Sequence, residues 1–179
     1  MTERGPSKYI LPNALTIARP FITREAIKAH QQGKKGKALV LLGAAWLSDA
    51  DGAVARKLDA TSRFGEIADP ISDLAMRVQL IKELEMARGT KAIKVIAESA
   101  IVITNLSLFA LSKSDPAIQS PVASPLGKIK MSVDALGAAR LITNPRDKIA
   151  SWAIAGMSVL TAIDYINSAR KSLSNARKA

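Results

Sequence analysis

Cysteine is absent from this 179-residue chain, and histidine occurs once, at His30. The lack of cysteine excludes disulfides, thiolate metal sites and cysteine nucleophiles. A single histidine cannot form a histidine cluster, which removes most zinc chemistry and serine–histidine catalysis. A metal ion bound by this chain would therefore have oxygen ligands, as magnesium, manganese and calcium prefer.

Aromatic residues are scarce, at 4%, and alternating polar–apolar runs between turn residues are nearly absent. Because such runs are the main strand signal, the sequence predicts an all-α protein. The formal charge of +11 implies an anionic partner. A single-stranded nucleic acid would need aromatic side chains to stack on, so we expect no nucleic-acid partner and favour an anionic membrane surface.

Breaker residues divide the chain into segments with helical spacing, and its length suits a single domain over residues 1–179. The segments are 11–30, 38–58, 66–88, 92–111, 126–143 and 149 to about 168, followed by the basic tail ARKSLSNARKA. The longest charge-free apolar runs are shorter than the roughly 18–20 residues that a spanning helix needs. Hydropathy alone leaves both a soluble helical bundle and a membrane bundle open.

Carboxylates are concentrated in the stretch SDADGAVARKLDATSRFGEIADPISD, in a chain with 15 acidic and 26 basic residues. Asp69 and Asp73 are four residues apart and share one helical face. Asp51 has Ser48 three residues before it on its own face, whereas Asp49 points elsewhere on a regular helix. A solvated acidic loop is one interpretation. The small residues and apolar flanks favour the other, in which two closely packed helices hold divalent cations between their carboxylates.

The segment DGAVAR, followed after eight residues by GEIADPISD, resembles the signature of the CDP-alcohol phosphatidyltransferases. The family pattern is D-x-x-D-G-x-x-A-R, a spacer, then G-x-x-x-D-x-x-x-D, and only its first aspartate lacks a direct counterpart. ILPNALTIARP is similar to the family's P-N-x-L-T-x-x-R entry to its first helix, and LGKIKM to its G-K-x-K segment. The resemblance spans roughly residues 8 to 170 and implies an integral membrane bundle of six transmembrane helices.

Members of this family transfer a phosphatidyl group from CDP-diacylglycerol to the hydroxyl of a small alcohol and release CMP. The resemblance implies two divalent cations, magnesium or manganese, which would clamp the pyrophosphate. It makes Asp51 and Asp69 metal ligands, and Asp73 both a ligand and the general base. It also implies a cytidine-nucleotide site shaped by Gly52, Ala55, Arg56 and Gly65.

The first metal position has two candidates. When the family pattern is aligned without a gap, the first metal position falls on Ser48, a neutral and weaker ligand. When one residue of the pattern is deleted, the position falls on Asp49, and a local change of helical winding is then required to turn this side chain inward. The sequence leaves both alternatives open.

The amino-terminal entry looks most like that of phosphatidylglycerophosphate synthases, whose acceptor is glycerol 3-phosphate. An anionic acceptor needs cations, and the candidates are Lys128, Lys130 and Arg19. The fourth helix of that subfamily usually brings an Arg-Glu pair, whereas this chain offers Glu98 without an arginine. The resemblance further implies a homodimer in the cytoplasmic membrane of a prokaryote, with its site facing the cytoplasm. The alternative is an inactive membrane relative that acts as a binding or scaffold protein.

Overall fold

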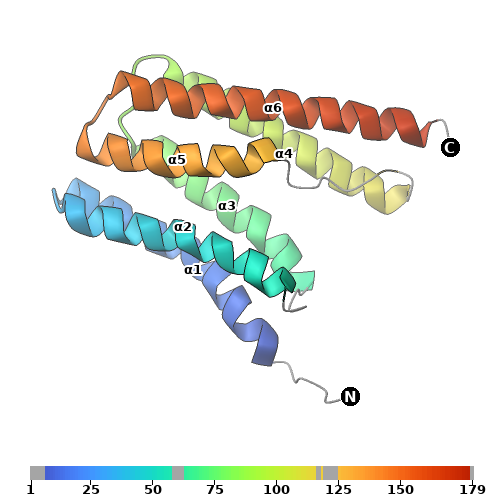
Figure 1. The fold of residues 1–179 in the computed structure, drawn as a ribbon, viewed down its shortest axis with the longest axis horizontal. Coiled ribbons are helices and arrows are strands. Elements are labelled where there is room, and N and C mark those ends of the chain that lie inside the picture. The colour runs from blue at the N-terminus through green and yellow to red at the C-terminus, as the bar shows by residue number, and fades with distance from the viewer. Residues whose placement is uncertain (1–6, 58–62, 116–117, 119–124, 178–179) are drawn as a thin grey trace. The chain divides into compact units, whose positions relative to one another are not determined.

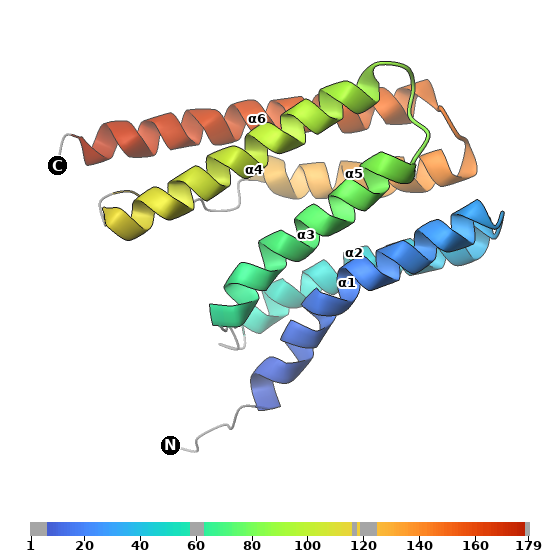
Figure 2. The same cartoon turned by 180° about the vertical axis from the view of Figure 1, so that it is seen from behind.

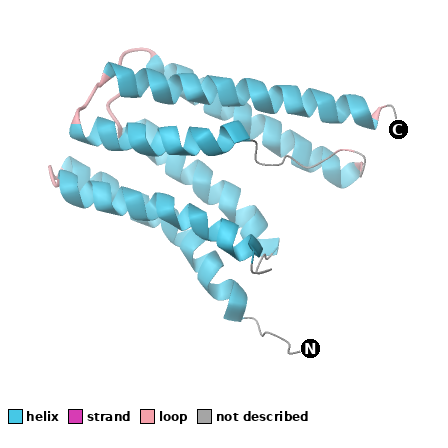
Figure 3. Cartoon of the chain, in the orientation of Figure 1, coloured by secondary structure: helices cyan, strands magenta, loops and turns pink. Residues whose placement is uncertain are grey.

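The structure, a computed structural model, describes the backbone of residues 7–57, 63–115, 118 and 125–177, and their side chains except those of 7–12, 48–57 and 63–70. This part of the chain forms six helices and no strand (Figure 1; Figure 3). They are α1 (Ser7–Gln31), α2 (Lys35–Lys57), α3 (Arg63–Glu83), α4 (Thr90–Ser114), α5 (Pro125–Thr143) and α6 (Lys148–Ala176). The all-α prediction is confirmed.

The ends of α3 and α6 differ most from the predicted segments, and the other ends lie within four residues of them. α3 was expected to continue to residue 88 but ends at Glu83, because tertiary contacts take the backbone groups that would extend it. Ala87 N donates to Ser151 Oγ at 2.8 Å, and Arg146 N donates to the carbonyl of Glu85 at 2.9 Å. α6 continues beyond residue 168 to Ala176, since the Ala, Arg, Lys and Leu residues of the basic tail favour helix.

The chain consists of two compact units, Met1–Leu84 and Glu85–Ala179. In the first unit α1 packs against both α2 and α3. A Schellman turn ends α1: Gly33 has φ 74°, its N–H donates to the carbonyl of His30, and Lys34 N donates to that of Ala29. The buried Ala26, Ala29 and Ala38 allow α1 and α2 to approach closely after this turn.

α1 is bent part-way along its length (Figure 2). Pro20 lies in the helix interior, where it cannot donate a backbone hydrogen bond and clashes with the preceding turn. The residue before it, Arg19, is 2% exposed. The bend therefore lies where α1 carries a buried charge.

In the second unit α6 packs against α4 and α5 (Figure 1). Gly137 allows the close approach of α5, since a Cβ at this position would lie 2.5 Å from Ile154 Cδ1 of α6. Further along α6, Ala162 packs with Ala97 and Ile101 of α4. Small residues therefore set both helix–helix distances in this unit.

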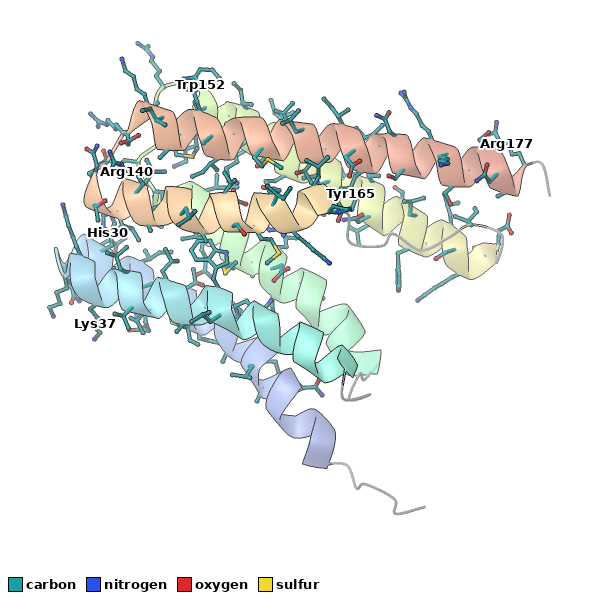
Figure 4. All side chains as sticks on the ribbon, in the orientation of Figure 1. His30, Lys37, Arg140, Trp152, Tyr165 and Arg177 are labelled. Carbon is teal, nitrogen blue, oxygen red and sulfur yellow. The ribbon has the colours of Figure 1, made fainter. Side chains whose placement is uncertain are left out.

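Asp147 caps the start of α6, where its Oδ1 accepts a hydrogen bond of 2.9 Å from Ala150 N. This bond, together with Arg140 Nε at 3.0 Å, holds the pKa of Asp147 below its usual value of 3.8. Arg140 and the half-exposed Trp152 lie at this same end of the unit (Figure 4). The cap thus joins the end of α5 to the start of α6.

Candidate active site

The carboxylates of the predicted motif lie on two successive helices of the first unit. Asp51 belongs to the last third of α2, Asp69 to the first half of α3, and Asp73 to the middle of α3. α2 is an uninterrupted α-helix as far as Lys57. The predicted site residues whose side chains lie outside the described part of the chain are Ser48, Asp49, Asp51, Gly52, Ala55, Arg56, Gly65 and Asp69. Their roles stay predictions.

Asp73 is the motif carboxylate whose surroundings the structure describes. Arg19 Nη1 of α1 donates to Asp73 Oδ1 at 2.5 Å, and Arg77 Nη2, one turn along α3, lies 3.9 Å from Oδ2. The Arg19 side chain is 2% exposed and that of Asp73 is 23% exposed. A short, charge-assisted hydrogen bond from a neighbouring helix fixes the orientation of the carboxylate. The structure therefore joins two residues that the sequence had assigned to different roles, the candidate base and a candidate acceptor cation.

The donors available for a divalent cation are the oxygens of the motif aspartates, which suits magnesium or manganese. Among the residues whose side chains are described, no group of three potential ligands lies close enough to hold a metal. Asp73 is the one motif aspartate within that set, and its carboxylate faces Arg19 and Arg77. The oxygen donors of the motif fit a hard cation, and the position of the Asp73 carboxylate is held by Arg19 and Arg77.

The remaining acceptor candidates lie near the start of α5 in the second unit. Lys128 is exposed, whereas the Lys130 side chain is 2% exposed. Lys130 Nζ lies 2.6 Å from Glu98 Oε1 of α4 and 2.6 Å from Asp134 Oδ2, one turn along α5. Lys130 is therefore a buried cation with two carboxylates, while Lys128 is a surface cation.

A second buried lysine completes this arrangement. Lys94 Nζ of α4 lies 3.1 Å from Glu98 Oε1 and 2.9 Å from Asp134 Oδ1. Lys94, Glu98, Lys130 and Asp134 thus form a closed ring of alternating charges, which we call the charge ring. The two positive and two negative groups give the ring a net charge of zero. Such pairing is expected, because an unpaired buried charge is energetically costly.

Ser158 connects the charge ring to α6. Its hydroxyl lies 3.1 Å from Glu98 Oε1 and 3.2 Å from Lys94 Nζ, and it also contacts the carbonyl of Ile154. Ser158 is 0% exposed, so these contacts are shielded from water. The ring therefore links all three helices of the second unit.

Sequence reasoning identified Lys130 and noted Glu98, but it missed Lys94, Asp134 and Ser158. A signal was present, because Lys94 precedes Glu98 by four residues and Lys130 precedes Asp134 by four. That spacing predicts two ion pairs within helices. It does not predict that the two pairs face one another, since this depends on how α4 and α5 pack.

The family model of the CDP-alcohol phosphatidyltransferases matches residues 9–163, which is most of the chain. The chain belongs to the CDP-alcohol phosphatidyltransferase family. Comparison with curated proteins and with solved structures gives no match. The resemblance inferred from the DGAVAR and GEIADPISD segments is therefore confirmed at the level of the family.

Membership makes the chain a transferase for substituted phosphate groups, in a membrane-associated family that generally depends on divalent cations. Of the helices that the structure describes, α4 and α6 are long and apolar enough to cross a membrane. Large apolar side chains are exposed on these helices; on α4, Ile103 is 64% exposed and Leu106 is 63% exposed. Such exposure is typical of helices that face lipid.

Proposed function

We propose that this CDP-alcohol phosphatidyltransferase transfers the phosphatidyl group of CDP-diacylglycerol to a small polar alcohol, with release of CMP, in phospholipid biosynthesis. The family match over residues 9–163 carries the proposal. The motif on α2 and α3 supports it, because these helices supply the carboxylates that such a transfer needs. We propose glycerol 3-phosphate as the acceptor.

In this proposal Asp51, Asp69 and Asp73 hold two divalent cations, with Ser48 or Asp49 in the first metal position. The cations would neutralise charge on the pyrophosphate during transfer. Asp73 also takes the proton of the acceptor hydroxyl, because an alcohol is a poor nucleophile until it is deprotonated. The cytidine nucleotide is bound near Gly52, Ala55, Arg56 and Gly65.

Arg19 contributes by orienting Asp73. A general base must lie within hydrogen-bond reach of the proton that it removes, so a defined carboxylate position is part of the catalytic requirement. The contact of 2.5 Å from Arg19 Nη1 to Asp73 Oδ1 supports this role, because it fixes where the carboxylate lies. Arg19, Lys128 and Lys130 each stay a candidate, from the sequence, for binding the acceptor's phosphate group.

The proposed setting is the cytoplasmic membrane of a prokaryote, with six spanning helices, the site facing the cytoplasm and two chains forming a dimer. An even number of crossings returns the chain to its starting face, so both termini should be cytoplasmic, where the basic end of α6 also belongs. Labelling of single cysteines introduced near residues 3 and 178 tests this topology in sealed vesicles. Access to the two positions from opposite faces would contradict six crossings.

The activity is tested by CMP release from CDP-diacylglycerol with a panel of alcohols that includes glycerol 3-phosphate, glycerol and inositol. Each reaction is run with magnesium, with manganese and with a chelator. The proposal expects metal-dependent CMP release with at least one alcohol, and fastest release with glycerol 3-phosphate. Asp115→Asn, which changes an exposed aspartate at the end of α4, is the matched control for the aspartate variants.

One observation favours a second candidate, a membrane relative without catalytic activity. The uninterrupted α2 helix favours Ser48, a neutral ligand, over Asp49 in the first metal position. If no alcohol and no cation supports CMP release from folded protein, this binding or scaffold role replaces the transferase proposal.

A further inference from the structure

Five exposed cations gather where α1 and α2 meet, and we call them the basic end of the first unit. They are Arg24, Lys28, Lys34, Lys35 and Lys37. Figure 4 shows Lys37 at the same end of the unit as His30, the next-to-last residue of α1. The Schellman turn at Gly33 joins the two helices by backbone hydrogen bonds, so these charges are carried on a fixed backbone.

One carboxylate lies among these cations. Lys28 Nζ lies 2.6 Å from Glu25 Oε1, in a pair whose side chains are 49% and 55% exposed. Lys37 and Arg24 also act on this carboxylate through their charges, which shows that the cation of α2 lies close to those of α1. An ion pair as exposed as this one is weak, so Lys28 is readily available to another anion.

The end of α3 does not change the charge balance. Glu83 lies at the basic end, where it accepts a hydrogen bond of 3.0 Å from Gln31 of α1. Lys82 precedes it in the last turn of α3 and offsets its charge. Five cations against the one carboxylate of Glu25 therefore leave the basic end with a net charge of +4.

The exposed face of α1 changes from apolar to cationic along the helix. Ile17 is 45% exposed and Phe21 is 62% exposed, and the exposed Arg24 and Lys28 follow them. Steps of three or four residues place these side chains on one face of the helix. The apolar part of this face therefore leads directly to the basic end.

The exposed face of α2 shows the same change in the opposite chain direction. It begins with Lys37 and continues with Val40, Ala44 and Leu47, of which Val40 and Leu47 are each 73% exposed. Steps of three or four residues again keep these side chains on one face. Both helices therefore carry an apolar stripe that ends in cations at the α1–α2 turn.

A phospholipid with an anionic headgroup has the same two features in the same order. Clusters of lysine and arginine beside a membrane attract anionic headgroups, and exposed apolar stripes fit acyl chains. A nucleic acid or another soluble polyanion would match the cations but would leave the apolar stripes in water. The combination of cations and stripes therefore favours a lipid.

We propose that the basic end binds the headgroup of an anionic phospholipid, whose acyl chains lie along the exposed stripes of α1 and α2. Lys35 and Asp51 are sixteen residues apart on α2, which is about 24 Å along the helix axis. In a spanning helix this distance places the basic end and the candidate active site near opposite headgroup regions. The bound lipid is therefore separate from the CDP-diacylglycerol of the proposed function. The basic end meets a headgroup region in either orientation of the chain in the membrane.

Quenching of a single tryptophan tests this site. The reporter chain carries Phe21→Trp together with Trp46→Phe and Trp152→Phe, which leaves one tryptophan beside the basic end. The full chain is reconstituted into bilayers with one fixed mixture of phosphatidylcholine and phosphatidylglycerol, and only the lipid that carries bromine on its acyl chains differs. Bromine quenches tryptophan fluorescence on contact. Phosphatidylglycerol should be preferred about fivefold, and the preference should fall at about 1 M salt, where charges are screened.

Two triple variants locate the preference. The test variant removes three charges of the basic end by Lys34→Gln, Lys35→Gln and Lys37→Gln, and its preference should fall close to one. The control removes three charges from the other end of the chain by Arg170→Gln, Lys171→Gln and Arg177→Gln, and it should keep the fivefold preference. All six side chains are exposed, so both variants should fold.

Three results would overturn the lipid site. They are equal quenching by the two brominated lipids, a preference that survives the loss of the three lysines, and a preference that the control variant loses as well. Loss of the preference when inorganic phosphate replaces chloride at constant ionic strength would assign the cations to a soluble anion, which also contradicts the proposal. None of these measurements involves CMP release, so the lipid site and the transferase activity can fail separately.

Discussion

Arg19 on α1 and Asp73 on α3 are 54 residues apart in the chain, and their side chains meet at 2.5 Å. The arginine is almost wholly buried, whereas the carboxylate is 23% exposed. The contact therefore connects a buried cation to a partly accessible anion. It couples the packing of the first unit to the position of its candidate base.

Replacing Arg19 should damage both stability and activity. Arg19→Met removes one partner of a largely buried ion pair, and we expect a loss of about 3 kcal/mol in the free energy of unfolding. Arg19→Met combined with Asp73→Asn should regain much of that stability, because no lone charge remains, but it should stay inactive. Thermal unfolding and CMP release measure the two effects. Equal stability of the single and double variants would show that the unpaired Asp73 carboxylate costs little.

The motif aspartates should be essential for transfer. Asp69→Asn and Asp73→Asn each remove a proposed metal-bound carboxylate, so CMP release should fall more than a hundredfold. Membrane insertion should persist in both, as judged by extraction and gel filtration in detergent. Wild-type rates in either variant would mean that these carboxylates are solvated and take no part in the reaction.

Ser48 and Asp49 should respond differently to substitution. If Ser48 occupies the first metal position, Ser48→Asp supplies the missing carboxylate and should raise metal affinity about tenfold, while Asp49→Ala changes little. The regular helix of α2 is the backbone that this alternative requires. If Asp49 is the ligand, Asp49→Ala should abolish activity and Ser48→Asp should gain nothing. Titration of CMP release with magnesium distinguishes the two outcomes.

Gly137 should tolerate no side chain. Gly137→Ala places a Cβ against Ile154, and overpacking of this kind costs about 1–3 kcal/mol, more than the helix propensity gained. Gly156→Ala is the matched control on α6, where nothing lies within 4 Å of the added Cβ. The control should be neutral or slightly stabilising. A higher melting temperature for Gly137→Ala would show that α5 and α6 can separate without cost.

The sequence predicted the helices better than it predicted their ends. Breaker residues such as Gly33 and Gly89 lie between helices as expected. Both adopt a positive φ, which glycine tolerates and which interrupts a helix. The end of α3 was wrong by five residues, since a hydrogen bond from Ala87 to Ser151 on a distant helix competes with helix propagation. Tertiary contacts of this kind leave no local signal.

At the candidate site, too, relations within one helix were predicted and contacts between helices were not. Spacing along α3 predicts that Asp69 and Asp73 share a face, because that relation lies within one helix. The contact of Asp73 with Arg19, and the meeting of Lys94 with Asp134, join residues on different helices. Such pairs depend on packing angle and register, which residue spacing does not determine.

The close approach at Gly137 limits how the second unit can move. Gly137 lies three residues beyond Asp134 on α5, and its contact Ile154 lies one turn before Ser158 on α6. Because Gly137 has no side chain, the Ile154 side chain packs directly against the backbone of α5 beside the charge ring. Ile154 and Ser158 lie one turn apart on the same helix, so the packing of Ile154 on Gly137 also fixes the position along α6 at which Ser158 meets the charge ring.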